Sequence, residues 1–530
     1  MENRTLLAIV LSVFVLIASQ YFLAKQEPPV PQQKQPAATA EKTAEKKEEA
    51  AKAVPAPVAV QTPSAEEKEI KVENDLYRAV FSSLGGTVRY WEVKKFKDKI
   101  GKDVILLAKP GSLPALAVGS NTNFDLSRVN FSVSGGDLKL DGNNKSGTLV
   151  FEYAKDGVSV RRTYTFYADK YEFDLTDQVT GLPEYWITLG TDFGIFDQTA
   201  GYTHVGPALL KGTSLEELTP KNLKEPKTFK DGLRWIAQED KYFFSAIVPL
   251  SQVEEARAWT YNGSSVIALK AKPGEAKFHM YAGPKDHDRL EKLGLGLEHV
   301  IDFGFFSIIA RPLFWILKFF YSFIGNYGWS IILLTIVVRI PFIPILNKGQ
   351  KSMKKLQQLQ PKMAEIKEKY KKDPQKMQAE MMELYKKYKV NPMGGCLPML
   401  LQIPVFFALY KVLLIAIELR AAPFMLWITD LSGPDTLFGH IPQWVPLLSG
   451  SAVGPLPIVM GLTMVIQQKM TPTSGDPRQA KMMMFMPVIF TFMFLNFASG
   501  LVLYWLVNNI LSIIQQVFVN KSLAKQTDAD

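Results

Sequence analysis

The feature that most constrains this sequence is an arginine inside an apolar segment long enough to cross a bilayer. Residues 327–346 read YGWSIILLTIVVRIPFIPIL, and Arg339 lies well inside this run. A charge near the centre of a spanning helix costs roughly 2.5–3.5 kcal/mol on insertion scales, so it is rarely left without a partner or a function. Thr335 precedes Arg339 by four residues, which places hydroxyl and guanidinium on one helical face. The two residues predict the polar wall of a groove inside the membrane.

The alternative is that Arg339 extends along the helix to the aqueous boundary. Asn347 lies eight residues further on, which corresponds to about 12 Å of helical rise. This distance is more than an arginine side chain comfortably reaches. The other apolar runs contain no Asp or Glu with which the arginine could pair. We therefore favour the groove.

The composition separates membrane segments from soluble ones. Hydrophobic residues make up 47% of the chain and are clustered into runs, and much of the net charge of +10 lies in one loop. A basic loop flanked by spanning helices is typical of the cytoplasmic side, which explains the charge better than nucleic acid does. The single cysteine, Cys396, permits no disulfide within one chain. No HExxH, P-loop or GxSxG pattern is present, so the sequence predicts no enzyme, metal or cofactor.

The N-terminal residues predict an anchor followed by a tether. Within residues 1–24 an apolar run follows Arg4 and lacks a small-x-small cleavage site, which favours an uncleaved signal anchor over a cleaved signal peptide. Residues 25–69 are rich in Pro, Ala, Lys, Glu and Gln and contain no aromatic residue. Such a segment cannot bury a core and predicts a disordered linker.

Residues 70–300 have the pattern of an all-β domain. Alternating runs such as NDLYRAVFSS, VRYWEVKKF and AKFHMYAG are separated by Gly, Asn and Asp turns, which predicts a large β-sandwich. Large sandwiches often bind sugars, but no pair of carboxylates here has a spacing that argues for catalysis. We expect an interaction or scaffolding role.

The remaining apolar runs predict the membrane helices. Residues 301–326 are aromatic-rich and interrupted by charges, which predicts an interfacial amphipathic helix, with an additional span as the alternative. Residues 327–347 form the second span, and residues 391–520 contain four more apolar runs, two of them short for a bilayer. The charges of the loops predict six spans, with both termini cytoplasmic, a short cytoplasmic tail at 521–530 and the β domain outside.

Residues 348–390 predict a basic helical hairpin. The segment from Lys348 to Lys389 contains thirteen lysines and five acidic residues. Apolar residues recur every three or four positions in two stretches of it. Asp373 and Pro374 have the features of an N-cap and a first helical residue, so the second stretch begins there and folds back on the first. A solvated hairpin without a partner and a hairpin that docks on ribosomal RNA or lipid headgroups both agree with this charge.

The last span carries polar residues along one face, where Tyr504, Asn508, Ser512 and Gln515 or Gln516 recur at spacings of three and four. Gln402 and Gln467 add polar groups to other spans. Such residues commonly bond neighbouring helices, which is the alternative to lining a groove. Sixteen of the 18 methionines lie between residues 353 and 493, and flexible, polarizable side chains suit a surface that accepts many apolar partners.

Several stretches resemble the YidC family of membrane protein insertases (YidC/Oxa/Alb), in the long form found in the inner membrane of Gram-negative bacteria. The matching stretches are FSSLGGTV, DFGFFSIIARPLFW, IVVRIPFIPI, NPMGGCLPMLLQIPVFFALYKVL, FMLWITDLS, QQKMTPTSGDP and SGLVLYW. The resemblance implies a polytopic α-helical membrane protein with six spans, five of which form the insertase core around a groove open to cytosol and lipid. It further implies a periplasmic β-sandwich domain and a cytoplasmic helical hairpin.

The resemblance implies roles for individual residues. Arg339 matches the groove arginine and Thr335 its neighbour. The predicted groove residues are Arg339, Thr335, Gln402, Gln467, Tyr504 and Asn508. The residues that the resemblance implies for the apolar surface along which incoming helices slide are Ile403, Pro404, Phe406, Met464, Met493 and Trp505.

The function expected on this basis is to take hydrophobic segments of nascent proteins from the cytosol into the bilayer, as insertase and chaperone, without a cofactor. The expected partners are nascent membrane proteins, the lipid bilayer, the ribosome and the Sec translocon, with no small-molecule substrate. A transporter or channel is the alternative, because polar intramembrane stripes also line solute paths, although no intramembrane carboxylate or inverted repeat supports coupled transport. A sugar-active enzyme built on the β domain is a third hypothesis.

Overall fold

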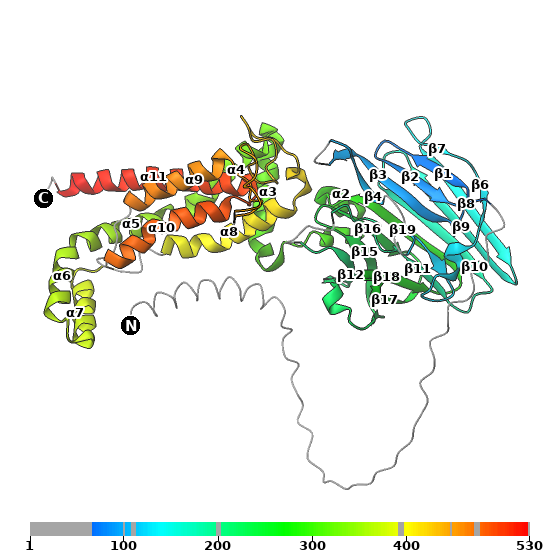
Figure 1. Cartoon of the computed structure of the whole chain (residues 1–530), viewed down its shortest axis with the longest axis horizontal. Coiled ribbons are helices and arrows are strands. Elements are labelled where there is room, and N and C mark those ends of the chain that lie inside the picture. The colour runs from blue at the N-terminus through cyan, green and yellow to red at the C-terminus, as the bar shows by residue number, and fades with distance from the viewer. Residues whose placement is uncertain are drawn as a thin grey trace, which may run out of the picture. The chain divides into compact units, whose positions relative to one another are not determined.

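The computed structural model describes residues 66–98, 101–107, 113–197, 203–390, 397–445, 448–470 and 477–527. The predicted signal anchor and most of the predicted linker lie outside the described residues. Within them a β domain precedes a helical region, as the sequence predicts (Figure 1).

The described part of the β domain contains three sheets, each built mostly from antiparallel neighbours. The first has the order β4 (Asp103–Leu107), β3 (Thr87–Lys97), β2 (Tyr77–Ser82), β1 (Glu69–Glu73), β7 (Leu138–Lys139). The largest has the order β13 (Ser214–Glu217), β12 (Gly206–Lys211), β15 (Leu233–Glu239), β16 (Phe243–Pro249), β19 (Gly274–Pro284), β10 (Glu172–Thr180), β9 (Val158–Tyr167), β8 (Ser146–Lys155), β6 (Ser132–Ser134). The third has the order β14 (Lys227–Phe229), β17 (Val253–Tyr261), β18 (Ser264–Ala271), β11 (Tyr185–Thr188), β5 (Val118–Gly119).

Strand β9 shows how the sequence sets the core. Its residues VSVRRTYTFY alternate between exposed or partly buried and fully buried positions, so Val160, Arg162, Tyr164 and Phe166 all point to the same, inner face. Three of these are ordinary core side chains. The fourth is an arginine, and the register of β9 against β10 places it opposite Asp177.

Arg162 and Asp177 form a fully buried ion pair at 0% side-chain exposure. The guanidinium Nε donates to the carboxylate at 3.0 Å, and Nη1 donates to the carbonyl oxygens of Leu116 at 2.7 Å and Gly85 at 3.0 Å. The Tyr185 hydroxyl donates to the same carboxylate. Because the charge is neutralised and its donors are occupied, this site holds together strands β9, β10 and β11 and the segments around Gly85 and Leu116.

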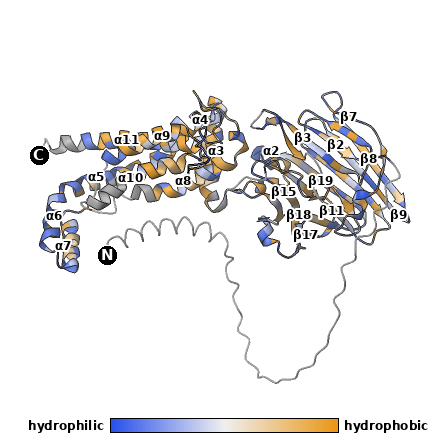
Figure 2. Ribbon diagram, viewed as in Figure 1, coloured by the Kyte–Doolittle hydropathy of each residue, from blue (hydrophilic) through white to orange (hydrophobic). Residues whose placement is uncertain are grey.

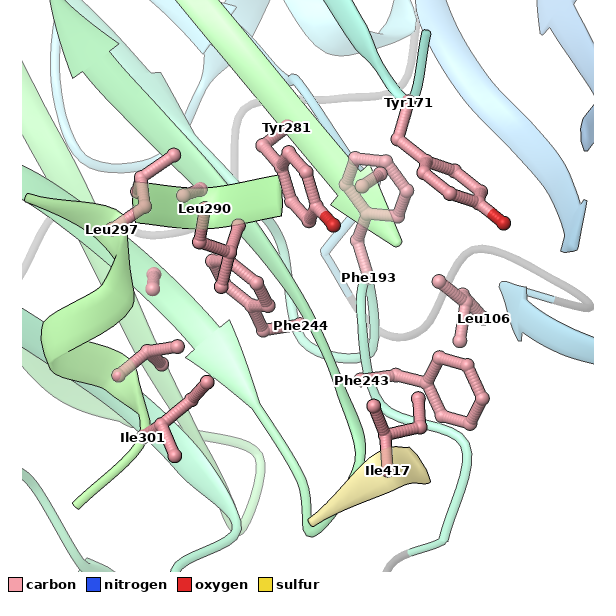
Figure 3. Close-up of a cluster of buried hydrophobic side chains, with 14 of the residues drawn as sticks. Leu106, Tyr171, Phe193, Phe243, Phe244, Tyr281, Leu290, Leu297, Ile301 and Ile417 are labelled. Atoms are coloured by element: carbon pink, nitrogen blue, oxygen red, sulfur yellow. The ribbon is translucent and has the colours of Figure 1, made fainter. Parts of the chain in front are cut away.

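The core of the β domain continues past its last strand. Helix α2 (His287–Leu293) is capped by Asp286, whose side chain accepts a hydrogen bond from the backbone of Arg289. Leu290 of α2 lies near the rings of Phe244 and Tyr281, which stack with centroids 4.7 Å apart (Figure 3). The short helix η3 (Leu297–Val300) adds two more buried apolar residues to this cluster.

The helical region is predominantly hydrophobic, apart from a polar pair of helices at one end (Figure 2). Its longer helices are α3 (Ser307–Ile324), α4 (Tyr327–Arg339), α5 (Ile343–Gln358), α6 (Gln360–Lys369), α7 (Pro374–Lys387), α8 (Leu397–Ile415), α9 (Pro455–Met470), α10 (Pro477–Phe494) and α11 (Ser499–Thr527). Short 3-10 helices are η1 (Asp125–Arg128), η2 (Pro220–Asn222), η4 (Gly304–Phe306), η5 (Ile340–Phe342) and η7 (Ile417–Leu419).

Among the described residues, three helical runs are long and apolar enough to cross a membrane, judged by length and composition only. They are Gly304–Ile324, Tyr327–Gln358 and Ser499–Lys521, and shorter apolar helices cover Leu401–Ile415 and Met484–Phe494. The helical, membrane-type character of this region is therefore confirmed. The count of six spans stays a prediction.

Helix α3 has two different faces. Ala310, Leu313 and Leu317 are buried, whereas Trp315 and Phe323 are 67% and 75% exposed. This amphipathic character agrees with the predicted interfacial helix, while the length of Gly304–Ile324 also suffices for a span. Both interpretations therefore stand for this segment.

The basic segment differs from the prediction at its start. The helical run of α4, η5 and α5 continues to Gln358, and a new helix, α6, begins at Gln360 with Pro361 in its first turn. The apolar repeat of the first predicted hairpin helix is therefore divided between α5 and α6, because a proline fits a first helical turn best and kinks or breaks a helix elsewhere. The hairpin itself consists of α6 and α7 (Figure 1).

The predicted start of the second hairpin helix is confirmed. Asp373 accepts a hydrogen bond from the backbone of Lys376 at 3.1 Å, and Pro374 is the first residue of α7. The apolar faces meet in a small core of their own. Its buried members are Leu356, Leu359, Met363 and Val390.

Candidate functional site: the polar cluster around Arg339

Arg339 hydrogen-bonds to one face of α11. Its Nη1 donates to the Asn508 side-chain oxygen at 2.6 Å, and its Nη2 donates to the Ser512 hydroxyl at 2.9 Å and the Gln515 side-chain oxygen at 2.8 Å. These three partners follow one another at intervals of four and three residues, which is the spacing of one helical face. The polar stripe predicted on the last span is thus the binding partner of the arginine on α4.

All three side-chain partners of Arg339 are uncharged. No carboxylate among the described residues lies within ion-pair distance of its guanidinium, although the side chain is partly buried. Hydroxyl and amide oxygens satisfy guanidinium donors but do not neutralise the positive charge. The cluster therefore keeps a net positive charge among apolar helices.

A second wall of the cluster comes from α8. Gln402 donates its amide hydrogen to the Tyr504 hydroxyl, and Tyr504 itself is buried. Thr335 is also buried, and its hydroxyl donates to the carbonyl of Ile331 at 2.6 Å, a bond that threonines commonly make within helices. Thr335, Arg339, Gln402, Tyr504 and Asn508 line one cavity of about 10 Å³, roughly the room that one water needs.

Five of the six residues predicted for the groove therefore lie together, whereas Gln467 lies elsewhere. It belongs to α9, which contacts another flank of α11 through a hydrogen bond of 3.2 Å from Asn509 to Thr463 and one from Gln516 to the Met470 carbonyl. The sequence could not reveal against which flank of α11 the helix α9 packs.

Ser512 and Gln515, which the sequence places on the polar face of the last span without a groove role, are direct partners of Arg339. Their spacing from Asn508 is the signal that identifies them, because positions four and seven residues further lie on the same helical face. Gln515 also donates to the side chain of Asn347 at 2.7 Å, which extends the polar contacts along α5.

The predicted apolar surface has a buried part and an exposed part. The rings of Phe406 and Trp505 meet with centroids 5.1 Å apart, and each contacts Phe494, so α8, α10 and α11 share one aromatic cluster. Ile403 and Met493 are 41% and 46% exposed. The remaining two residues are Met464, which packs against the core, and Pro404, which interrupts the hydrogen-bond ladder of α8.

The closest neighbours among the helices follow the order α8, α3, α4, α11, α9, α10. The two ends of this series, α8 and α10, carry the exposed Ile403 and Met493. The aromatic cluster lies between these ends and the polar cluster lies on α4, α8 and α11.

One group of residues in the described structure has the geometry of a metal site. His287, Asp288 and Glu291 of α2 bring one possible ligand atom each within 4.8 Å of one another. Both carboxylates are exposed, and the Nδ1 atom of His287 lies 3.6 Å from the Asp288 carboxylate. Because exposed acidic groups often gather without an ion, this group carries no metal assignment.

These features define a class of protein: a helical membrane protein with a positively charged polar cluster between its helices and a β-rich domain attached. The side chains of the cluster include no carboxylate, histidine or cysteine, so the common catalytic pairs are missing from it.

Comparison with known proteins identifies the family. The model of the 60Kd inner membrane protein family matches residues 319–526, and that of the YidC periplasmic domain matches residues 69–316. A membrane protein insertase YidC from Geotalea daltonii is 42% identical and is covered over 100% of its length by 99% of this chain. Another from Geobacter metallireducens is 41% identical, with 99% of each chain covered. A crystal structure described as an active YidC insertase is 21% identical, covers 85% of this chain and 92% of its own, and has a TM-score of 0.38. The chain belongs to the YidC family of inner membrane protein insertases, with a periplasmic β domain.

Proposed function

We propose that the cluster around Arg339 lowers the barrier to inserting hydrophobic segments of nascent proteins into the inner membrane. The observation that carries this proposal is the uncompensated charge of Arg339, held by Asn508, Ser512 and Gln515. An arginine that served only to bond helices together would be cheaper to bury beside a carboxylate. A charge held by neutral groups stays available to a client.

The energetics of insertion assign this role to a polar cluster. Burial of a client's apolar side chains in lipid contributes about 25 cal/mol per Å² and supplies the drive. The obstacle is the polar flank of the client, because unsatisfied polar groups cost several kcal/mol each in hydrocarbon. The cluster offers donors and acceptors to that flank part-way across the bilayer, so the mechanism needs no nucleotide or cofactor.

The apolar part of the client follows a different surface. Ile403 on α8 and Met493 on α10 are exposed at the two ends of the helix series, with the Phe406 and Trp505 rings between them. Methionine adapts to differently shaped apolar partners, which suits a surface that receives many clients. In this proposal a client helix lies on α8 and α10 and leaves sideways into lipid, and the protein acts as a chaperone while it does so.

The hairpin of α6 and α7 is proposed to receive ribosomes or clients. It has its own small core, and the segment from Lys348 to Lys389 carries thirteen lysines against five acidic residues. A basic surface accelerates encounters with anionic partners. The loop charges support a cytoplasmic position of both termini, which belongs to the same proposal. Contact with the Sec translocon is a further part of it.

A photocrosslinking experiment tests the proposed route. A photoreactive amino acid at Ile403 or Met493 should crosslink to a ribosome-stalled membrane protein, because both side chains are exposed beside the aromatic cluster. The matched control is the same probe at Phe323 of α3, which is 75% exposed but lies outside this surface. Equal crosslinking at all three positions would contradict a defined route.

A channel or transporter is tested by solute flux. The cavity that Arg339 shares with Gln402 and Tyr504 has a volume of about 10 Å³, so between these helices there is room for roughly one water and not for a continuous solute path. Liposomes that contain the full chain should insert a small membrane protein while small solutes leak no faster than from empty liposomes. Rapid flux without a client would favour the channel.

A further inference from the structure

A groove of about 480 Å³ lies between the α4–α5 run and α11, on a different side of Arg339 from the small cavity. Its two walls come from helical stripes at intervals of three and four residues, from Ile336 to Lys351 on one side and from Leu511 to Val519 on the other. Arg339 belongs to this groove as well as to the polar cluster.

A polar track follows the groove from Arg339 towards the end of α5. Arg339 donates to Gln515 at 2.8 Å, and Gln515 donates to Asn347 at 2.7 Å. Lys351 lies one helical turn beyond Asn347 and is exposed. The lining residues include two cations and no carboxylate, so the electrostatics favour an anionic ligand.

The walls beside this track are apolar and exposed. Ile340 is 56% exposed on one wall, and Ile514 and Phe518 are 46% and 69% exposed on the other. A ligand with a negatively charged head and a hydrocarbon chain matches both parts of the groove. The charged head would lie at Lys351, and the hydrocarbon chain would lie along Ile340 and Ile514.

The size of the groove distinguishes a lipid from a client helix. A helix with side chains is about 10 Å in diameter, so a volume of about 480 Å³ would hold only about 6 Å of its length, or roughly one turn. A single extended chain needs a far smaller cross-section and lies along the groove. An extended acyl chain therefore fits within the groove, whereas a helix would only rest against its open side.

We propose that this groove binds one anionic phospholipid, with its phosphate at Lys351 and Asn347 and an acyl chain along Ile340, Ile514 and Phe518. Basic pockets between helices at the cytoplasmic surface are a recurrent way of binding such headgroups. The proposal is independent of insertion, because it requires no client and is measured without one.

Native mass spectrometry of the full chain in detergent tests the site with three probes. Phosphatidylglycerol should be retained as one tightly bound copy, at least about tenfold more than phosphatidylcholine of the same acyl chains. Glycerol phosphate, which has the charge but no chain, should not be retained. Equal retention of the two lipids would overturn the proposal, and retention of glycerol phosphate would show an anion site instead of a lipid site.

Two variants locate the binding. Lys351→Gln should lower phosphatidylglycerol retention about tenfold, and Ile514→Trp should lower it similarly by filling the groove without a change of charge. The matched control is Lys348→Gln, which removes the same charge from the same helix at an exposed position outside the groove lining. Equal losses in Lys351→Gln and Lys348→Gln would show diffuse attraction and overturn the site, as would full retention in Ile514→Trp.

Discussion

The β domain and the helical region each contain an arginine with little access to solvent, and the two differ in whether a carboxylate neutralises the charge. Arg162 in the β domain is fully buried and pairs with Asp177 at 3.0 Å. Arg339 in the helical region is partly buried, and its partners among the described residues are all neutral: the side chains of Asn508, Ser512 and Gln515 and the Asn508 backbone carbonyl. In the first case the charge is neutralised and the residue supports the fold. In the second case the charge persists, which is the condition for attracting something that is not part of the chain.

The largest effect that the comparison predicts is on stability in the β domain. Arg162→Met should destabilise the domain by about 3–5 kcal/mol, because Asp177 would remain buried without a partner. Denaturant titration of the full chain in detergent measures this loss in the free energy of unfolding. The matched control is Arg161→Met, since Arg161 is 54% exposed and its pair with Glu152 spans 3.3 Å. A surface pair of this kind contributes about 0–1 kcal/mol, and equal losses in the two variants would refute the structural role of Arg162.

A second effect is the pH dependence of the stability of the β domain. Both arginines stay charged over the pH range concerned, so the effect comes from a histidine. Burial lowers the pKa of His204 to about 4, and its Nε2 lies 2.9 Å from the Pro207 carbonyl. The unfolded chain has an ordinary histidine pKa near 6.5 and so binds the proton first as the pH falls. The β domain should therefore be about 2 kcal/mol less stable at pH 5 than at pH 7 from this group alone. His204→Asn should remove that share of the pH dependence, and an unchanged pH profile would contradict the assignment.

A third prediction concerns a variant that gives Arg339 a carboxylate partner, as Arg162 has. Asn508→Asp places a carboxylate at the atom that accepts from Arg339 at 2.6 Å, as Asp177 does for Arg162. Because the charge would then be neutralised, insertion of a client with an acidic tail should fall about tenfold, the equivalent of about 1.4 kcal/mol. The control, Asn520→Asp, adds the same charge to α11 twelve residues away and should have little effect. Normal insertion by Asn508→Asp would break the comparison.

Helical periodicity explains which parts of the site the sequence could predict. Thr335 and Arg339 on α4, and Tyr504 and Asn508 on α11, each share a face because they are four residues apart. The same reasoning identifies Asp373 as a cap, because its signal is local. The fold class followed from the length and spacing of the apolar runs.

Contacts between distant segments were beyond this reasoning. Arg162 pairs with Asp177 through the register of β9 and β10, and nothing in an alternating pattern shows which residues face each other across two strands. Gln467 is absent from the lining of the cavity because α9 packs beside Asn509 and Gln516 of α11, and a helix sequence does not show which flank of a neighbour it will contact. The division of the basic segment at Pro361 was readable in principle, since proline marks the first turn of a new helix.

The central claim is that the charge of Arg339 attracts acidic groups of clients, and insertion by three proteins tests it directly. The wild-type chain, Arg339→Lys and Arg339→Ala are compared in liposomes, each with one client whose translocated tail is either acidic or neutralised. Arg339→Lys should retain much activity, with some deficit from the loss of the planar guanidinium. Arg339→Ala should insert the acidic-tailed client at least about tenfold more slowly and the neutral-tailed client with a smaller defect. Equal defects for both tails in Arg339→Ala, or full activity in all three proteins, would contradict the claim.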